Sequence, residues 1–510
     1  MKADNDLYRR LRELPPARLW QEEVPRFDQL GPREREQQVA LVRALGVVFA
    51  DSRNPEMKAA VKAWVVGLLQ DPSEKIRRYA TAAIPKLGGD EESERKLIDI
   101  LKTTEVDREK KKVASALEKI GGAATLKAVA GAGERLVDEQ KLRASVARQE
   151  GPSAIRLDAV VPKQPGLRLH LRCRKGLESI VADEVGEDEG RGGKFRVVEV
   201  RGCFVVVEPK EAFTLGELHR LRCFDTVAFF LAFIRQPGSP EAIDVLAKAI
   251  ASPQAEKLMV SLTQGAPRYR LSMMAEGNHD DAVAKVAKKA FALNPRVLND
   301  AREAPWSVDV HFDERSALVE LRPRISPNPR LYYRTDAVDA ASHPPLAACL
   351  VRVAGRQEKE VVWDPFCGSG LELIESALAG GVGQVIGTDI DPAAIAIAEA
   401  NFKAAKLPGT KAAFHACDFR DIVRIPELDR GKVSLVISNP PLGRRVRVPN
   451  MHGLFADLFK IASEVLRPNG RLVFVNPLRL SSVDPTLRLE SSRTVDLGGY
   501  DCRLEVYRKR

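Results

Sequence analysis

The segment Asp364-Pro-Phe-Cys-Gly-Ser-Gly370 places an acidic residue and two glycines between a predicted strand and a predicted helix. Gly368 and Gly370 carry no Cβ, so the backbone can approach a ligand closely at these two positions. The first turn of the helix that follows offers free N–H groups to a carboxylate. The spacing differs from G-x-G-x-x-G, which disfavours a dinucleotide. The sequence therefore predicts a small-ligand site at the end of a strand.

Acidic residues also end the next two predicted strands. Asp389 ends the second strand, where a carboxylate is placed to accept both hydroxyls of a ribose. Asp391 is the better candidate for capping the next helix, because Pro392 suits the first helical position. Asp418 follows the third strand, where a carboxylate can accept from an adenine amino group. Three acidic strand ends in chain order predict a nucleoside ligand.

The fourth predicted strand ends in Asn439-Pro-Pro-Leu442. The side-chain oxygen of Asn439 and the carbonyl of Pro440 are two acceptors on backbone that proline makes rigid. Two such acceptors can hold an exocyclic –NH₂ group and align its lone pair with an electrophilic methyl group. An ordinary turn after a strand is the alternative interpretation. Together with the glycine segment, the pattern favours methyl transfer to an amine.

These residues require a parallel sheet that collects strand ends at one edge. From residue 346 onward, predicted strands and helices alternate, which is typical of a doubly wound α/β sheet. Strands are expected at 360–363, 384–388, 412–416, 433–438 and 471–475, and helices near 371–379, 392–405 and 452–466. Two further strand-like runs, 493–497 and 502–507, suit a terminal hairpin.

The rest of the chain divides into a helical region, a linker and a second domain. Residues 1–150 have helical periodicity, and 76–89 aligns with 109–122 at an offset of 33, which is typical of stacked helix pairs. These repeats resemble HEAT repeats, and an irregular helical bundle is the alternative. Residues 151–166 are rich in Pro and Gly and predict a linker, and 167–325 has the mixed pattern of an α+β domain.

Residues 340–510 resemble class I S-adenosylmethionine-dependent methyltransferases of the amine-methylating group that carries N-P-P-[FY]. The resemblance implies a Rossmann-like domain with a seven-stranded doubly wound sheet, S-adenosylmethionine as cofactor, and catalytic roles for Asn439, Pro440 and Pro441. The cofactor-binding residues that it implies are Pro345, Asp364, Phe366, Cys367, Gly368, Gly370, Asp389, Ile390, Asp418, Phe419 and Asn439.

Within that group the chain is most similar to THUMP-domain RNA methyltransferases that modify guanine N2. In those enzymes a ferredoxin-like plus THUMP module precedes the catalytic domain, and 167–185 and 294–323 look like that module. The resemblance implies structured RNA, tRNA or rRNA, as partner. Leu442 is expected to contact the target base, and Arg444, Arg445 and Arg447 are expected to contact the RNA because they directly follow the catalytic loop. Leu442 replaces the usual aromatic residue, and the N-terminal repeats lie outside the family pattern.

Two alternatives stay open. The first is another substrate of the same N-P-P chemistry: adenine N6 in RNA or DNA, or a glutamine side chain of a protein, against which the THUMP-like module argues. The second is a non-catalytic RNA-binding scaffold with a degenerate methyltransferase fold, against which the intact cofactor residues argue. Titration of the dialysed protein with S-adenosylmethionine would distinguish a degenerate domain from an active one.

The amino-acid composition further limits the class of protein. The chain of 510 residues is 44% hydrophobic and 29% charged, which excludes a mostly disordered protein. It has no apolar run long enough to span a bilayer, and its first residues lack a signal peptide, so a cytoplasmic location is expected. The seven cysteines are scattered without C-x-x-C, so no metal is expected.

The net charge of +10 is spread along the chain, so local clusters must carry any argument for an RNA partner. Besides the arginines after Asn439, the candidates are Arg322 to Arg334 and Arg172 to Lys175. Lys110-Lys111-Lys112 is expected to be a solvated helix face. The N-terminal repeats are a further candidate surface for protein or RNA.

Overall fold

The computed structural model describes the chain except residues 1, 53, 131–135, 339–341, 422–424, 444–447, 479 and 483, and except the side chains of 2–4 and 240. The chain forms two compact units, Met1–Ile155 with Phe233–Val319, and Arg156–Ala232 with Glu320–Arg510. The division between the units passes through the predicted central domain 167–325. Within the described part of the chain, no helix is both long enough and apolar enough to cross a membrane.

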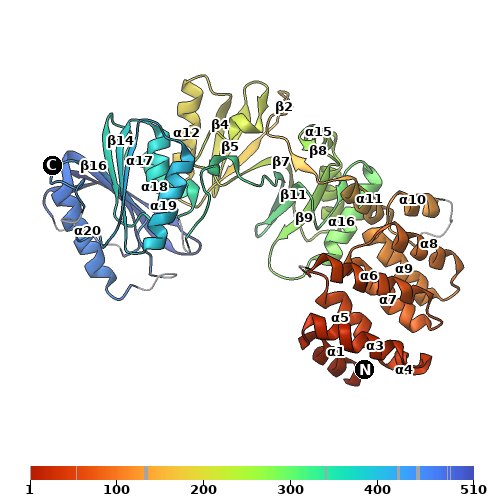
Figure 1. The fold of residues 1–510 in the computed structure, drawn as a ribbon. Helices are drawn as coiled ribbons and strands as arrows, with labels where there is room; N and C mark the ends of the chain where they lie inside the picture. The colour runs from red at the N-terminus through yellow and green to blue at the C-terminus, as the bar shows by residue number, and fades with distance from the viewer. Residues whose placement is uncertain are drawn as a thin grey trace. The chain divides into compact units, whose positions relative to one another are not determined.

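The described part of the first 150 residues consists of helices joined by loops, as predicted (Figure 1). The segments are α1 (Lys2–Glu13), α2 (Pro16–Arg18), η1 (Leu19–Glu23), α3 (Val24–Asp28), α4 (Pro32–Gln37), α5 (Ala40–Val48), α6 (Pro55–Gly67), η2 (Leu68–Gln70), α7 (Glu74–Leu87), α8 (Glu91–Thr103), α9 (Asp107–Ile120), α10 (Ala123–Ala130) and α11 (Glu139–Glu150). Helix α7 begins at residue 74 and ends at 87, whereas α9 begins at 107 and ends at 120. Both ends are therefore 33 residues apart, which is the predicted repeat offset.

Helix α7 packs between α5 and α9. A Cβ on Gly46 of α5 would lie 2.8 Å from the Cβ of Ala83, so glycine permits the close approach of α5 and α7. Arg77 of α7 donates to both carboxylate oxygens of buried Glu109 on α9, at 2.7 and 2.9 Å. Ser73 is the N-cap residue of α7, and its N–H donates to the carboxylate of Asp71 at 2.9 Å.

The second part of the first unit packs on α11. It contains α14 (Pro240–Ile250), α15 (Pro253–Ser261), α16 (Asp280–Leu293), β8 (Thr263–Gln264) and the strand order β10 (Leu298–Asn299), β9 (Arg268–Met274), β11 (Trp306–Phe312), β12 (Ser316–Pro323). Asp300 accepts from Arg268 and from Arg148 of α11, at 3.0 Å each. The predicted linker is partly ordered, because β1 (Ala154–Ile155) pairs with β8.

The second unit begins with a β-α-β-β-α-β segment. Its elements are β3 (Leu169–Arg172), α12 (Glu178–Gly190), β4 (Phe195–Arg201), β5 (Phe204–Pro209), α13 (Leu215–Leu218) and β7 (Thr226–Arg235), with the strand order β7-β3-β5-β4. This is the connection order of a ferredoxin-like unit. A short pair of β2 (Val160–Val161) and β6 (Phe213–Thr214) joins the end of the predicted linker to it.

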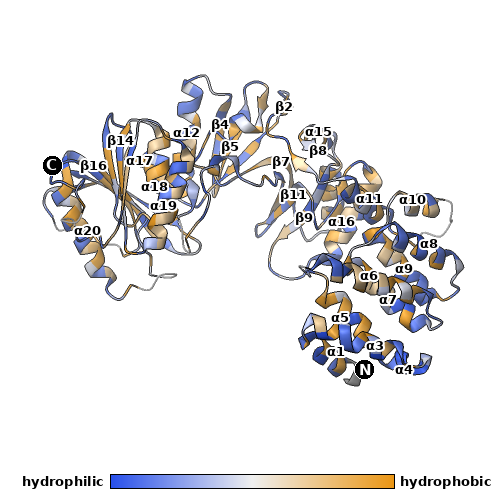
Figure 2. Cartoon of the chain, in the orientation of Figure 1, coloured by the Kyte–Doolittle hydropathy of each residue, from blue (hydrophilic) through white to orange (hydrophobic). Residues whose placement is uncertain are grey.

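The C-terminal sheet has seven strands in the order β15-β14-β13-β16-β17-β19-β18. The strands are β13 (Glu360–Asp364), β14 (Val382–Asp389), β15 (Lys411–Ala416), β16 (Val433–Ser438), β17 (Leu466–Asn476), β18 (Leu487–Asp496) and β19 (Asp501–Lys509), and the helices are α17 (Pro344–Ala354), α18 (Leu371–Ala379), α19 (Pro392–Ala405) and α20 (Met451–Val465). The predicted hairpin is β18–β19, and β19 runs antiparallel to β17, so the sheet is mixed. Helix α18 is coloured largely as hydrophobic in Figure 2, as expected for a helix buried on the sheet.

The ferredoxin-like segment and the C-terminal sheet of the second unit are joined by one half-buried and one buried arginine. Arg222 donates to both oxygens of Glu375 on α18, at 2.6 and 2.7 Å, and Tyr333 donates to the same carboxylate at 2.6 Å. Arg330 is 5% exposed and donates to the carbonyls of Phe224 and Asp225. Arg330 therefore has a structural role, and its predicted contact with RNA is wrong.

Candidate active site

The sheet order reverses at β13, whose neighbours β14 and β16 are followed by strands on opposite sides. Ligands of such sheets bind outside the carboxyl ends of the strands at this point. Asp364 ends β13 and is fully buried. Its Oδ1 accepts from the Phe366 N–H at 3.0 Å and from the Ser438 hydroxyl at 2.7 Å, whereas Oδ2 has no hydrogen-bond partner among the described residues. Burial raises the pKa of Asp364 well above its usual range.

The glycine loop runs from β13 to α18 and is hydrogen-bonded to the end of β14. Gly368 and Gly370 have φ of +50° and +82°, backbone conformations that favour glycine. The Gly368 N–H donates to Oδ2 of Asp389 at 3.0 Å, and the Cys367 N–H donates to the carbonyl of Thr388 at 2.9 Å. The structure therefore brings the predicted loop and the predicted ribose acceptor into direct contact.

Asp391, not Asp389, caps α19. Its carboxylate accepts from the Ala393 N–H at 2.9 Å, and Pro392 occupies the first turn, as the sequence predicted. The second carboxylate oxygen of Asp389 accepts from the Asp391 N–H at 3.0 Å. Ile390 is 75% exposed, next to Asp389 at the end of β14. An exposed aliphatic side chain beside a carboxylate suits one face of a nucleoside.

The end of the third strand is less open to a ligand than predicted. Arg420 donates to both oxygens of Asp418, at 2.8 and 2.5 Å, and these hydrogen bonds lower the pKa of Asp418. An adenine amino group would have to compete with this guanidinium. Phe419 is buried, and the centroid of its ring lies 4.8 Å from that of Phe366. These two predicted residues therefore pack against each other.

Asn439 follows β16 and reaches the segment before α17. Its Nδ2 donates to the Ser342 hydroxyl at 3.0 Å, and its Oδ1 is buried without a hydrogen-bond partner among the described residues. Pro440 is buried, and Pro441 and Leu442 are half-buried. A buried carbonyl oxygen without a donor is unfavourable in the free protein, so this acceptor suits a donor that arrives with a ligand.

Sequence reasoning missed two polar residues of this site, Ser342 and Glu372. Glu372 lies in the first turn of α18, is 2% exposed, and its carboxylate forms a hydrogen bond with Ser342. Its Oε1 has no partner within the described residues. Burial raises the pKa of Glu372 from 4.5 to about 7. The available signal was an acidic residue directly after the glycine loop, in a helix turn that is otherwise apolar.

Some predicted residues are not joined to this cluster. Pro345 lines a small cavity with Arg222 and Glu375, and none of the other predicted cofactor-binding residues, all of which lie in the described part of the chain, lines it. Arg444, Arg445 and Arg447 lie outside the described residues, so the structure says nothing of the basic cluster after Leu442. Among the residues that the structure describes, no group of three or more His, Cys, Asp or Glu could hold a metal ion.

Glu372→Gln should stabilise the protein at pH 8 and have little effect at pH 5. A carboxyl whose pKa rises on folding stabilises the folded state while it is protonated, and this contribution is lost as the pH rises through about 7. The neutral amide of glutamine does not ionise, so at pH 8 we expect the variant to have a free energy of unfolding up to about 3 kcal/mol higher than the wild type. Thermal unfolding at the two pH values measures it. The exposed Glu399→Gln on α19 is the control, and an equal gain at both pH values would contradict the assignment.

Comparison with known proteins places these features in context. Residues 332–495 match the family described as RMKL-like, methyltransferase domain. Over 138 residues the chain is 30% identical to the tRNA (guanine(10)-N2)-dimethyltransferase of Methanocaldococcus jannaschii. The aligned region covers 27% of this chain and 38% of that protein. It is also 30% identical over 161 residues to the ribosomal protein L11 methyltransferase of Teredinibacter turnerae, which covers 30% of the chain and 48% of that protein.

Among solved structures, TrmN from Thermus thermophilus is similar with a TM-score of 0.52 at 24% identity, over 68% of this chain and 100% of that chain. This likeness concerns the fold alone. The family match shows that the chain contains a methyltransferase domain, and the methyl donor of this domain is S-adenosylmethionine.

The chain spans only 38% and 48% of the lengths of the two curated relatives, and these relatives act on different substrates. The residues present fit the cofactor. Gly368 has a positive φ and donates its N–H to the Asp389 carboxylate, and two buried oxygens, on Asp364 and Asn439, lack partners among the described residues.

Proposed function

We propose that this protein transfers a methyl group from S-adenosylmethionine to an exocyclic amine of a base in structured RNA, with guanine N2 in tRNA or rRNA as the favoured target. The observation that carries the proposal is the buried Oδ1 of Asn439, which has no donor among the described residues and lies at the sheet edge that holds the glycine loop. An amine with two N–H groups would supply the missing donor.

The cofactor would lie across the ends of β13, β14 and β15. Asp389 would accept the ribose hydroxyls, Gly368 and Gly370 would let the backbone approach, and Ile390 would cover one face of the adenine. Of the other predicted contacts, Phe366, Cys367 and Phe419 would supply apolar surface, whereas Asp418 would bind adenine only after releasing Arg420. We keep Pro345 as a weaker candidate, since it lines a different cavity.

Catalysis would rest on positioning. When bound, the cofactor supplies an electrophilic methyl group. Asn439 Oδ1 and the Pro440 carbonyl would accept the two N–H groups of the amine and turn its lone pair toward that methyl group. Ser342 holds the Asn439 amide by its Nδ2, which fixes the direction of Oδ1. Pro441 would keep the turn rigid, and Leu442 would contact the base without the stacking face of an aromatic ring.

RNA is favoured over protein as substrate by two features. A relative named as a tRNA guanine-N2 dimethyltransferase is 30% identical to this chain over 138 residues. The ferredoxin-like order of β3 to β7 supports our assignment of 167–325 as a THUMP-like RNA-binding module ahead of the catalytic domain. The similarity to a ribosomal protein methyltransferase keeps a protein amine as the second candidate.

The test is transfer of labelled methyl groups from S-adenosylmethionine into total RNA and ribosomal protein from cells that lack this enzyme, followed by identification of the labelled product. N2-methylguanosine would support the proposal, and N6-methyladenosine would move the target to adenine. Label in protein alone would overturn the RNA assignment. The Asn439→Ala variant, purified in parallel, controls for contaminating methyltransferases.

A further inference from the structure

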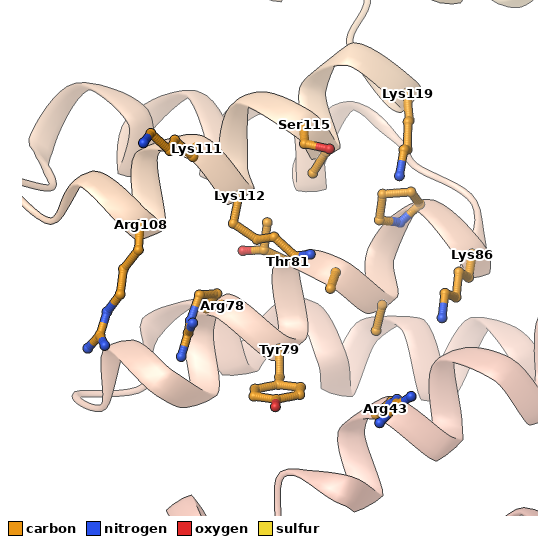
Figure 3. Close-up of a pocket in the computed structure, with 14 residues that line it drawn as sticks. Arg43, Arg78, Tyr79, Thr81, Lys86, Arg108, Lys111, Lys112, Ser115 and Lys119 are labelled. Atoms are coloured by element: carbon orange, nitrogen blue, oxygen red, sulfur yellow. The ribbon is translucent and has the colours of Figure 1, made fainter. Parts of the chain in front are cut away.

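A basic hollow lies on the N-terminal helices, far along the sequence from the methyltransferase domain. Side chains of α5, α7 and α9 line it, and its volume is about 580 Å³ (Figure 3). Its cations include Arg78, Lys86, Arg108, Lys111, Lys112 and Lys119. None of the lining residues is acidic in the part of the chain that the structure describes. The predicted solvated face at Lys110–Lys112 therefore includes two lysines of a shared basic surface.

The repeat in the sequence produces this surface. Arg78 of α7 corresponds to Lys111 of α9, and Lys86 corresponds to Lys119, at the repeat offset of 33. On α9 the cations at 108, 111, 112 and 119 follow the spacing of one helix face. Successive repeats thus place a cation at matching positions of neighbouring helices. Packed helices lie about 8–10 Å apart, so the cations form a row rather than a single point.

Several of these charges have no counter-charge. Glu74 pairs with Arg78 at 3.3 Å and with Arg108 at 2.7 Å. Lys86, Lys111, Lys112 and Lys119 form no ion pair within the described residues. Partial loss of solvent around its ammonium group, followed by the positive charges of Arg302, Lys112 and Lys86, lowers the pKa of Lys119. The free protein therefore concentrates like charges that repel each other, and an anion in the hollow would relieve this repulsion.

The geometry points to a site for the sugar-phosphate backbone of RNA, and we propose that the N-terminal helices hold the RNA whose base the C-terminal domain methylates. The inference rests on the proposed function for the identity of that RNA. Phosphates repeat along a strand as the cations repeat along the helices. The lining offers Tyr79 as its sole aromatic ring among the described residues, so the contacts would be electrostatic and independent of sequence.

The test measures binding of an unmodified tRNA transcript to the full-length protein by fluorescence anisotropy, at several salt concentrations. The variant of the basic hollow, called the groove variant below, is Lys111→Ala/Lys112→Ala/Lys119→Ala. The three lysine side chains that it removes are exposed. The control is Arg95→Ala/Lys102→Ala/Lys127→Ala, which removes the same charge from exposed positions of α8 and α10 outside the hollow. Thermal unfolding of both variants checks that they fold.

We expect the groove variant to lose at least tenfold in affinity and its log–log salt slope to fall by about two, the effect of losing two to three phosphate contacts. The control should stay within about threefold, and a variant with arginine at all three lysine positions should bind like the wild type. Equal losses in the groove and control variants would overturn the inference, as would a wild-type protein that does not bind the transcript. RNA binding that depends on the groove, without methyl transfer, would instead contradict the proposed function and leave this inference standing.

Discussion

Asn439→Ala should lower the rate constant of methyl transfer by about 10²–10³ while cofactor affinity stays within about twofold. Losing one preorganised acceptor at a developing charge has this order of effect. Oδ1 of Asn439 is buried and lacks a donor among the described residues, so the only hydrogen bond that the substitution breaks in the described part of the free protein is the one from Nδ2 to Ser342. Single-turnover methyl transfer with saturating S-adenosylmethionine measures the rate, and calorimetry measures cofactor binding.

Ser342→Ala is the companion variant for this prediction. It removes the hydroxyl that accepts from Nδ2 of Asn439 but keeps the free Oδ1. If Oδ1 binds the amine, Ser342→Ala should lose no more than about tenfold in rate, because it keeps Oδ1 and removes only the hydrogen bonds of Ser342 with Asn439 and Glu372. If Asn439 merely anchors the segment before α17, the two variants should behave alike. Near wild-type turnover of Asn439→Ala would make the Asn-Pro-Pro turn structural.

Asp389→Ala should weaken S-adenosylmethionine binding by about 1.5–3 kcal/mol, which is roughly 10- to 150-fold in Kd. Two effects contribute in the same direction. The carboxylate would accept the ribose hydroxyls, and in the free protein its two oxygens already hold the Gly368 and Asp391 N–H groups. Removing it both deletes a ligand contact and releases the glycine loop. Calorimetric titration of the dialysed protein measures the affinity.

Asp391→Ala is the matched control for that prediction, because it removes a neighbouring carboxylate with a different role. Asp391 caps α19 through the Ala393 N–H, so its loss should reduce stability by about 1 kcal/mol and leave cofactor affinity nearly unchanged. Asp389→Asn keeps oxygen and size and should fall between wild type and Asp389→Ala. An unchanged Kd for Asp389→Ala would remove Asp389 from the cofactor site.

Local patterns in the sequence predicted the elements of the catalytic domain well. The apolar strands, the glycine loop and the proline after Asp391 are short-range signals, and β16, α18 and α19 begin and end where these signals place them. The N-terminal repeat was visible for the same reason, since α7 and α9 repeat both length and apolar spacing. The acidic strand ends were found because a parallel sheet gathers such ends at one edge.

The partners of individual side chains were decided by tertiary structure alone. Ser342 and Asn439 are 97 positions apart in sequence, and Arg330 is buried only because the ferredoxin-like segment supplies carbonyls to it. Asp418 is the exception, because its partner Arg420 is only two residues away in the sequence. Lys111 and Lys119 become one surface with Arg78 and Lys86 only when α7 packs on α9. A sequence shows which groups a chain carries, but the charge and hydrogen-bonding state of each group depends on neighbours that folding brings from distant positions.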